Sequence, residues 1–163
     1  SLTVTRQGVP ISFDVIVLHL KAFGDSADRR RDAMDKLYAY CEAEALTSVV
    51  ILGDLNDDPH DAPTDNVFTG NFLETEPDYV FLTAQLPEDT VTSTGWYQII
   101  DGEKVYGENL DHVIFGGTLH AACERVEMGV EGVEASEFDA YTDALSDHFP
   151  VWVSCLPDPT VSP

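Results

Sequence analysis

The sequence contains few basic residues. Lysine and arginine together number eight, and only Lys21, Lys36 and Lys104 are lysines, against 30 aspartates and glutamates, so the formal net charge is -22. Proteins that bind nucleic acid usually hold its phosphates with lysine and arginine, so this composition excludes long-range attraction of a polyanion such as DNA. A phosphate ligand would therefore need a metal cation to offset the field of the protein. The charge fits either a highly soluble surface or a saline environment, where salt screens the repulsion.

Cysteines and long apolar runs are also scarce. None of the three cysteines lies in a Cys-x-x-Cys pair, which argues against a zinc site. Their odd number excludes a complete set of intrachain disulfides, and one disulfide between Cys123 and Cys155 remains open. No apolar run approaches the roughly 18 residues of a membrane-spanning helix, and the first residues lack the pattern of a signal peptide. We therefore expect no membrane span.

The length and the apolar pattern predict one layered domain. A chain of 163 residues, 44% of them hydrophobic, is typical of a single globular domain. Residues 13–19 are β-branched and apolar and predict a buried strand, and residues 26–45 predict a helix capped by Ser26 or Asp25. The apolar residues at helical spacing on that helix are Met34, Leu37, Tyr38 and Cys41. A strand at 48–53 completes a strand, helix, strand order, which indicates an α/β fold.

The remainder of the chain predicts shorter elements. Residues 57–78 read as a loop, with a short helix beginning near Thr64. Further strands are expected at 79–83, 96–100, 111–115, 121–128 and 149–155. The tail is rich in proline and cannot join the interior of a sheet. We therefore expect a domain over residues 1–156, followed by a flexible tail over 157–163.

Polar groups gather at the ends of the expected strands. The four motifs are HLK at 19–21, GDLN at 53–56, LDH at 110–112 and SDHFP at 146–150. Each alone has an ordinary structural explanation, such as a turn, a helix cap or a hydrogen-bonded core histidine. Strand ends fix the backbone and let side chains from several strands converge. The four motifs together, in this order, therefore predict a shared site.

The four motifs in this order resemble the C-terminal half of the endonuclease/exonuclease/phosphatase superfamily. That group includes pancreatic deoxyribonuclease, the apurinic endonucleases, sphingomyelinases and inositol-polyphosphate phosphatases. The resemblance covers residues 13–153. It implies an α/β (α+β) fold, namely a layered β-sandwich with flanking helices that forms the second half of a deoxyribonuclease-like four-layer fold.

The resemblance also implies a catalytic role for each matching residue. His19 would lie near the scissile phosphate and protonate the leaving group or bind a phosphate oxygen. Asp54 would orient or deprotonate the attacking water, and Asn56 would bind phosphate or metal beside it. Asp111 would hold His148 in its working tautomer, so that His148 contacts the phosphate.

Metal and substrate ligands are implied in the same way. The expected metal ligands are Asp147, Asp54 and Asn56, and Asn56 and His148 are expected to bind substrate. Lys21 follows His19 by two residues and so points to the same side of an extended strand, where it is expected either to bind substrate phosphate or to lie on the surface. The expected cofactor is Mg²⁺, with Mn²⁺ or Ca²⁺ as alternatives. These assignments fit the chemistry, because a carboxylate beside a cation can orient water and an Asp-His pair supplies a positioned imidazolium. A hard cation prefers oxygen ligands and acts as a Lewis acid on the phosphoryl oxygen.

Several other polar residues carry weaker expectations. Asp57 and Asp58 read as solvated loop charges, and at least one of the arginines at 29–31 is expected to form a salt bridge with a nearby acid. His112 occupies a position where the family often has an aromatic residue, and it has no assigned role. The residues for which core packing or no role is expected are Trp96, Tyr97, His60 and His120.

One family feature is missing, and it shapes the functional hypotheses. The family's first half carries a Gln-Glu pair whose glutamate binds metal, and no such pair occurs here. We therefore expect an incomplete chain, whose exposed face is covered by a missing N-terminal half or by a second copy. The leading hypothesis is a metal-dependent phosphodiester hydrolase of the nuclease type, acting on DNA or RNA. The alternatives are a phosphatase or a phospholipid or small-molecule phosphodiesterase, and a non-catalytic half-domain for binding or assembly. Secretion is the favoured location, and a saline setting is one interpretation of the charge.

Overall fold

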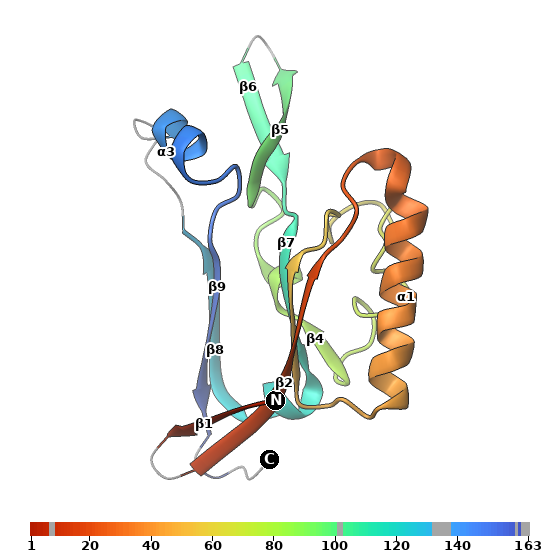
Figure 1. Cartoon of the computed structure of the whole chain (residues 1–163), viewed down its shortest axis with the longest axis vertical. Helices are drawn as coiled ribbons and strands as arrows, with labels where there is room; N and C mark the ends of the chain where they lie inside the picture. Colours follow the sequence, from red (N-terminus) through yellow and green to blue (C-terminus); the bar gives the residue numbers. More distant parts are fainter. Residues whose placement is uncertain (7–8, 101–102, 132–137, 159, 161–163) are drawn as a thin grey trace.

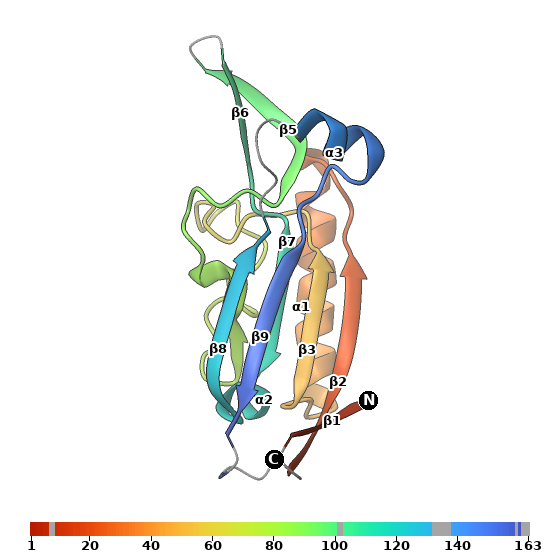
Figure 2. The ribbon, with the colours of Figure 1, turned by 90° about the vertical axis from the view of Figure 1, so that its left-hand side faces the viewer.

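A five-stranded sheet forms the middle layer of the structure, with a long helix on one face and a two-stranded ribbon on the other (Figures 1 and 2). The computed structural model describes residues 1–6, 9–100, 103–131, 138–158 and 160. The sheet has the order β1-β2-β3-β7-β4. Its strands are β1 (Leu2–Arg6), β2 (Val9–His19), β3 (Val49–Asp54), β7 (Asp111–Gly116) and β4 (Tyr79–Phe81). β2 and β3 are parallel, whereas the other neighbours are antiparallel.

The other elements surround this sheet. Helix α1 (Ala27–Ala43) follows the 3-10 turn η1 (Gly24–Ser26) and covers one face. The ribbon on the other face pairs β8 (Cys123–Val130) with β9 (Val151–Pro157). The hairpin of β5 (Ser93–Ile100) and β6 (Glu103–Glu108) extends beyond one end of the sheet, beside α3 (Phe138–Ala144) (Figure 1). The two remaining elements are η2 (Leu82–Gln85) and α2 (Gly117–Ala121).

The alternation of side chains along β3 explains the two cores. Val49 and Ile51 are fully buried on the α1 side, where they pack with Met34 and Cys41 of the helix. Val50 points to the opposite face and packs with residues of β7 and of the ribbon. Successive side chains of a strand face opposite sides, so a strand buried on both faces reads as a continuous apolar run. The predicted α/β order and the apolar face of the helix are therefore confirmed.

One local prediction was wrong. The region near Thr64 forms turns instead of a short helix, because the side chain of Asn66 bonds Pro59 O and Phe68 N and so competes with helical hydrogen bonds. β9 continues to Pro157, which lies opposite Cys123. A two-stranded ribbon has only edge strands, and an edge strand tolerates a proline. Positions 159 and 161–163 of the expected tail lie outside the described residues, as do the side chains of Trp96 and Tyr97.

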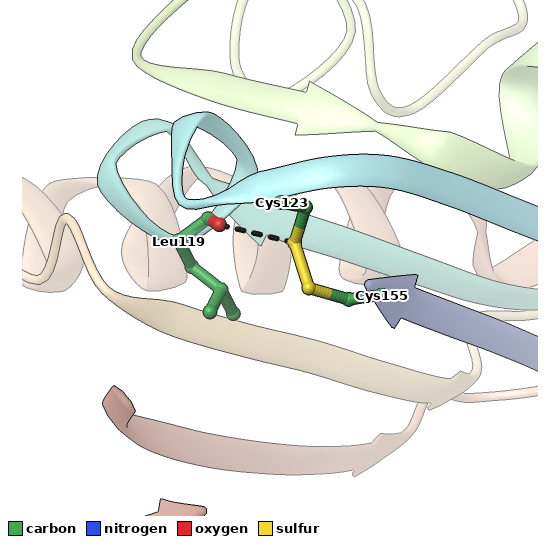
Figure 3. Close-up of a disulfide and its surroundings, with 3 residues drawn as sticks. All are labelled: Leu119, Cys123 and Cys155. Carbon is green, nitrogen blue, oxygen red and sulfur yellow. Dashed lines mark hydrogen bonds between the residues drawn. A yellow bond between two sulfur atoms is a disulfide. The ribbon is translucent and has the colours of Figure 1, made fainter. Parts of the chain in front are cut away.

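A disulfide joins the two strands of the ribbon. Cys123 and Cys155, which are 32 residues apart in the sequence, form a disulfide (Figure 3), so the open pairing is confirmed. The Cys123 sulfur lies 3.3 Å from the carbonyl oxygen of Leu119, next to α2. Cys41 is a free thiol in the core, and burial raises its pKa to about 11. The disulfide thus ties the ribbon together at the end of the sheet from which α2 leads into β8.

Gly53 allows β3 to run close to β2. Its φ of 137° lies in a region that side chains rarely adopt. A Cβ built at this position would lie 1.9 Å from the carbonyl oxygen of Leu18. Backbone cannot give way as a flexible side chain can, so a glycine is required one residue before Asp54.

Replacing this glycine tests that requirement. We expect Gly53→Ala to destabilise the fold by more than about 3 kcal/mol, because backbone strain and a steric clash add. Gly70 also has a positive φ, of 85°, but no atom lies within 4 Å of a Cβ built there. Gly70→Ala is therefore the matched control, with an expected loss of about 1 kcal/mol. Urea unfolding measures the free energy of unfolding of both variants. Equal losses of stability in Gly53→Ala and Gly70→Ala would contradict the account.

Candidate active site

Three neighbouring strands place polar side chains in one row. His19 is the last residue of β2, Asp54 the last of β3 and Asp111 the first of β7. The strand register pairs His19 with Asp54 and Asp54 with Asp111. Residues in register share a face of the sheet, so the three side chains lie together on the ribbon side. The distance between His19 Nε2 and Asp54 Oδ2 is 3.4 Å.

A fourth segment adds His148 from the loop before β9. Its Nδ1 lies 2.7 Å from Asp111 Oδ2, and its Nε2 lies 3.7 Å from Asp54 Oδ2. The loop is held in place, because His148 N donates to Ser146 Oγ and Tyr141 Oη donates to His148 O. The expected pairing of His148 with Asp111 is therefore confirmed, and four segments converge at one end of the sheet.

The Asp111 carboxylate sets the state of the His148 ring. An ionised carboxylate only accepts, so Nδ1 carries the proton of this bond and Nε2 is directed to the site. The hydrogen bond to Asp111 raises the pKa of His148 above its ordinary value, and the charges of Asp111, Asp54 and Asp147 add to it, whereas burial opposes it. The imidazolium is therefore favoured at this position.

The pKa of Asp54 is also raised, but mainly by burial. Its side chain is only 17% exposed, and burial raises its pKa, with the charge of Asp111 as the next cause. The charges of His148 and His19 and the N–H of Asn56 lower it. Two carboxylates and two imidazoles thus share a small region, and the charges of Asp54 and His148 each shift the pKa of the other.

Asn56 shapes the loop that follows Asp54. Its φ of 54° is left-handed, a conformation that asparagine tolerates better than most residues. Its backbone N–H donates to Asp54 Oδ1 at 3.0 Å, and its side-chain Nδ2 donates to Leu20 O at 3.1 Å. These bonds fix Asp54 Oδ1 and leave Oδ2 facing the histidines.

The remaining expected ligands are less closely assembled. Lys21 lies beyond the end of β2, and its ammonium sits 5.3 Å from the centre of the Phe23 ring. Asp147 is exposed beside His148. Within the described residues, no three Asp, Glu, His or Cys side chains form a group that could hold a metal. The metal roles of Asp54, Asn56 and Asp147 and the substrate role of Lys21 therefore stay predictions.

Asp57 and Asp58 are not the solvated loop charges that we expected. Asp57 is 6% exposed and accepts two N–H bonds from Arg30, because the left-handed Asn56 turns the chain inward toward α1. Asp58 accepts from the backbone N–H groups of His60 and Asn109. The expected salt bridge from the arginines at 29–31 is thus confirmed for Arg30.

The sequence reasoning also missed residues that support the row. Thr92 is fully buried, and its Oγ1 accepts from the backbone N–H groups of Leu110 and Asp111. Ser93 forms a backbone bridge with His148, and its Oγ lies 3.4 Å from His148 Nε2. His112 follows Asp111 along β7 and so faces the α1 side, where it is 1% exposed. Strand alternation is a signal that could have placed His112, whereas nothing local marked Thr92.

The described part of the chain has no helix long and apolar enough to cross a membrane.

Comparisons with known proteins agree with the fold and the motifs. A family model, described as the Endonuclease/Exonuclease/phosphatase family, matches residues 5–148. Among solved structures, the chain is similar to the human Nocturnin catalytic domain with bound sulfate anion, at 16% identity and a TM-score of 0.50. That match covers 90% of this chain and 47% of the other, so the chain spans about half the length of that structure. No curated protein matches the sequence.

The family match decides what kind of protein this is. It extends over most of the chain and includes the first three of the four motifs and part of the fourth. Family members are typically hydrolases of phosphoester bonds, and they commonly use divalent metals. The layered α/β architecture is also similar to that of the Nocturnin domain. The chain belongs to the endonuclease/exonuclease/phosphatase family.

Proposed function

We propose that this site hydrolyses phosphodiester bonds with a divalent cation, with nucleic-acid backbones as the leading substrate. The observation that carries the proposal is the meeting of His19, Asp54 and the Asp111-His148 pair at one end of the sheet. Hydrolysis of a phosphodiester needs an activated water, charge neutralisation on the phosphate and a proton for the leaving oxygen. Each need has a candidate group in this set.

Asp54 is the candidate for activating water. Its Oδ1 is held by the N–H of Asn56, so Oδ2 has a fixed direction toward the open side of the site. A positioned carboxylate can accept the proton of an attacking water, and a raised pKa makes it a stronger base. Burial supplies that rise for Asp54.

The two histidines are the candidates for the phosphate and the leaving group. His148 donates its Nδ1–H to Asp111, so its Nε2–H can donate to a phosphate oxygen when the ring is charged. His19 is 74% exposed and lies across Asp54 from Asp111. It can therefore reach the leaving oxygen of a substrate that enters from solvent.

The carboxylates at this end of the sheet support the proposal of a hard cation, although no three described Asp, Glu, His or Cys side chains are grouped closely enough to hold one. Asp54 and Asp111 are close enough for the charge of Asp111 to raise the pKa of Asp54, and a cation would relieve that repulsion. Carboxylate and amide oxygens suit Mg²⁺, with Mn²⁺ or Ca²⁺ as alternatives. Asp54, Asn56 and Asp147 would hold the ion, which when bound neutralises charge on the phosphoryl oxygens.

The charge of the chain favours a second candidate function. With a formal net charge of -22, the protein repels a long polyanion, whereas a small phosphoester or a phospholipid headgroup meets less repulsion. A phosphatase or a small-molecule phosphodiesterase with the same site is therefore the alternative. Comparing plasmid DNA with a chromogenic phosphodiester at low and high salt separates the two, because salt screens the repulsion.

Asp54→Asn tests the proposed base. With Mg²⁺ or Mn²⁺ present, we expect the variant to lose about 10²- to 10⁴-fold in rate on both substrates, the range for removal of a general base. The matched control is Asp32→Asn, which removes an exposed carboxylate paired with Lys36 on α1 and should leave the rate unchanged. Wild-type cleavage that persists in chelator, or in Asp54→Asn, would contradict the proposal.

Asp111→Asn tests the histidine pair through pH. The pKa of His148 is raised in the folded chain, so this pair stabilises the fold fully below the ordinary histidine pKa and loses its effect as pH rises through the folded value. We expect Asp111→Asn to lower the His148 pKa, which NMR titration of the imidazole measures. Its melting temperature should fall more at about pH 5.5 than at about pH 9, since the ring is charged only at the lower pH. A pH-independent loss would argue against the pairing.

Among the described residues, part of an apolar face of the sheet is left open on the ribbon side. The ribbon does not cover β2 (Figure 2), where Val17 is 69% and Val15 37% exposed. Beside them lies a groove of about 380 Å³, lined by residues that include Phe13, Val50, Leu52, Val113 and Val153. Contiguous exposed apolar surface marks an interaction site. We propose that further polypeptide covers this face in the working protein, either the other half of the fold or a second copy.

Association and dye binding test this cover. In sedimentation runs at high salt, we expect the chain either to dimerise or to remain a monomer that binds an apolar dye. Val17→Asp should abolish the dimerisation or the dye binding that the wild type shows, because it places a charge on the open face. Tyr40→Asp is the control, since Tyr40 is 53% exposed on α1, away from this face. A wild-type monomer that binds no dye would contradict the proposal.

A further inference from the structure

A buried ion pair lies beside the loop that carries Asn56. Arg30 of α1 and Asp57 are each 6% exposed. Arg30 Nε and Nη2 both donate to Asp57 Oδ2, at 3.0 and 2.8 Å. Two charges withdrawn from water are costly, and such a pair is often no more stabilising than apolar residues of the same size. Stability alone therefore does not explain why charge is kept here.

The remaining bonds of Arg30 connect two loops of the site. Its Nη1 donates to Lys21 O at 3.1 Å and to Phe23 O at 2.8 Å. These carbonyls belong to the loop after β2, which follows His19, whereas Asp57 belongs to the loop after β3, which follows Asp54. The planar guanidinium presents several donors in a fixed geometry, which the single ammonium of lysine cannot reproduce. Arg30 thus bridges the two loops directly.

A second set of bonds holds Asp57 from the side of β7. Asp57 O accepts from His112 Nε2 at 2.9 Å, and since a carbonyl only accepts, Nε2 carries the ring proton. His112 Nδ1 then accepts from Thr83 Oγ1 at 2.9 Å, and Thr83 Oγ1 accepts from Val113 N at 3.2 Å. Burial lowers the pKa of His112 to about 4, so the ring is neutral at ordinary pH. The loop after β3 is therefore anchored to the strand that begins with Asp111.

These contacts bear on the geometry of the site because Asn56 lies between Asp54 and Asp57. Its left-handed backbone places Asp57 in the core while its own N–H bonds Asp54 Oδ1. If Asp57 left the core, the turn at Asn56 would be free to change. The direction of Asp54 Oδ2 toward His19 would change with it.

We propose that Arg30 is a positioning residue of the site, which through Asp57 locks the loops after β2 and β3 in the arrangement that brings His19 and Asp54 together. Asp57 and His112 complete the same network. The kinetic part of this proposal rests on the proposed hydrolysis, whereas the structural part does not.

Arg30→Lys tests the proposal, with Arg31→Lys as the matched control. Arg31 is the next residue of α1 and also donates to backbone carbonyls. These belong to Asn66 and Thr64, farther along the segment after β3, and no described hydrogen bond joins Arg31 to Asp57 or to the loop after β2. We expect Arg30→Lys to fold and to speed amide exchange at residues 20–24 and 54–58 by about tenfold or more. We expect kcat to fall about 10- to 100-fold with KM nearly unchanged, the loss typical of a small displacement of reacting groups. Arg31→Lys should change neither quantity.

The exchange and kinetic measurements distinguish a failure of the role of Arg30 from a failure of the proposed function. Normal exchange in both loops of Arg30→Lys, or equal effects of the two lysine variants, overturns the proposal. If the wild-type chain cleaves no phosphoester, the proposed function fails, and the exchange comparison alone still supports or overturns the role of Arg30. If Arg30→Lys does not fold, Asp57→Asn, which keeps the shape of the side chain, takes its place in the same comparison.

Discussion

The register between β2, β3 and β7 is the constraint on which the site depends. It sets His19, Asp54 and Asp111 side by side at one end of the sheet and on one face. A shift of one residue in any of these strands would turn a side chain to the opposite face. Gly53 permits the close approach that this register requires, since a Cβ there would meet Leu18 O. The chemistry of the site therefore begins in the backbone, before any side-chain contact is considered.

The two faces of the sheet have different roles. On the α1 side, an apolar core encloses the bonds of Arg30, Asp57 and His112, which hold the loops at the end of the sheet. On the ribbon side, the row of His19, Asp54 and Asp111 faces outward and meets His148. The same strands thus carry a rigid support on one face and reactive groups on the other. This division follows from strand alternation, which sends neighbours such as Asp111 and His112 to opposite sides.

Much of this arrangement could be predicted from the sequence, because it is local or repeats a known order of motifs. The strand, helix, strand order follows from apolar periodicity, and the pairing of Asp111 with His148 follows from the family resemblance. The burial of Asp57 could not be predicted, because it depends on the φ of Asn56 and on a partner 27 residues away. The support from Thr92 is likewise tertiary, since a lone threonine just before a strand carries no signal of its own.

The central claim is that groups on one face of the sheet bind a phosphate together, and NMR of the histidines tests it most directly. Inorganic phosphate with Mg²⁺ would be titrated into the chain while the imidazole signals of the five histidines are followed. The account predicts that His19 and His148 shift together and that His112, buried on the other face, does not. No shift at His19 and His148, or an equal shift at His112, would contradict it.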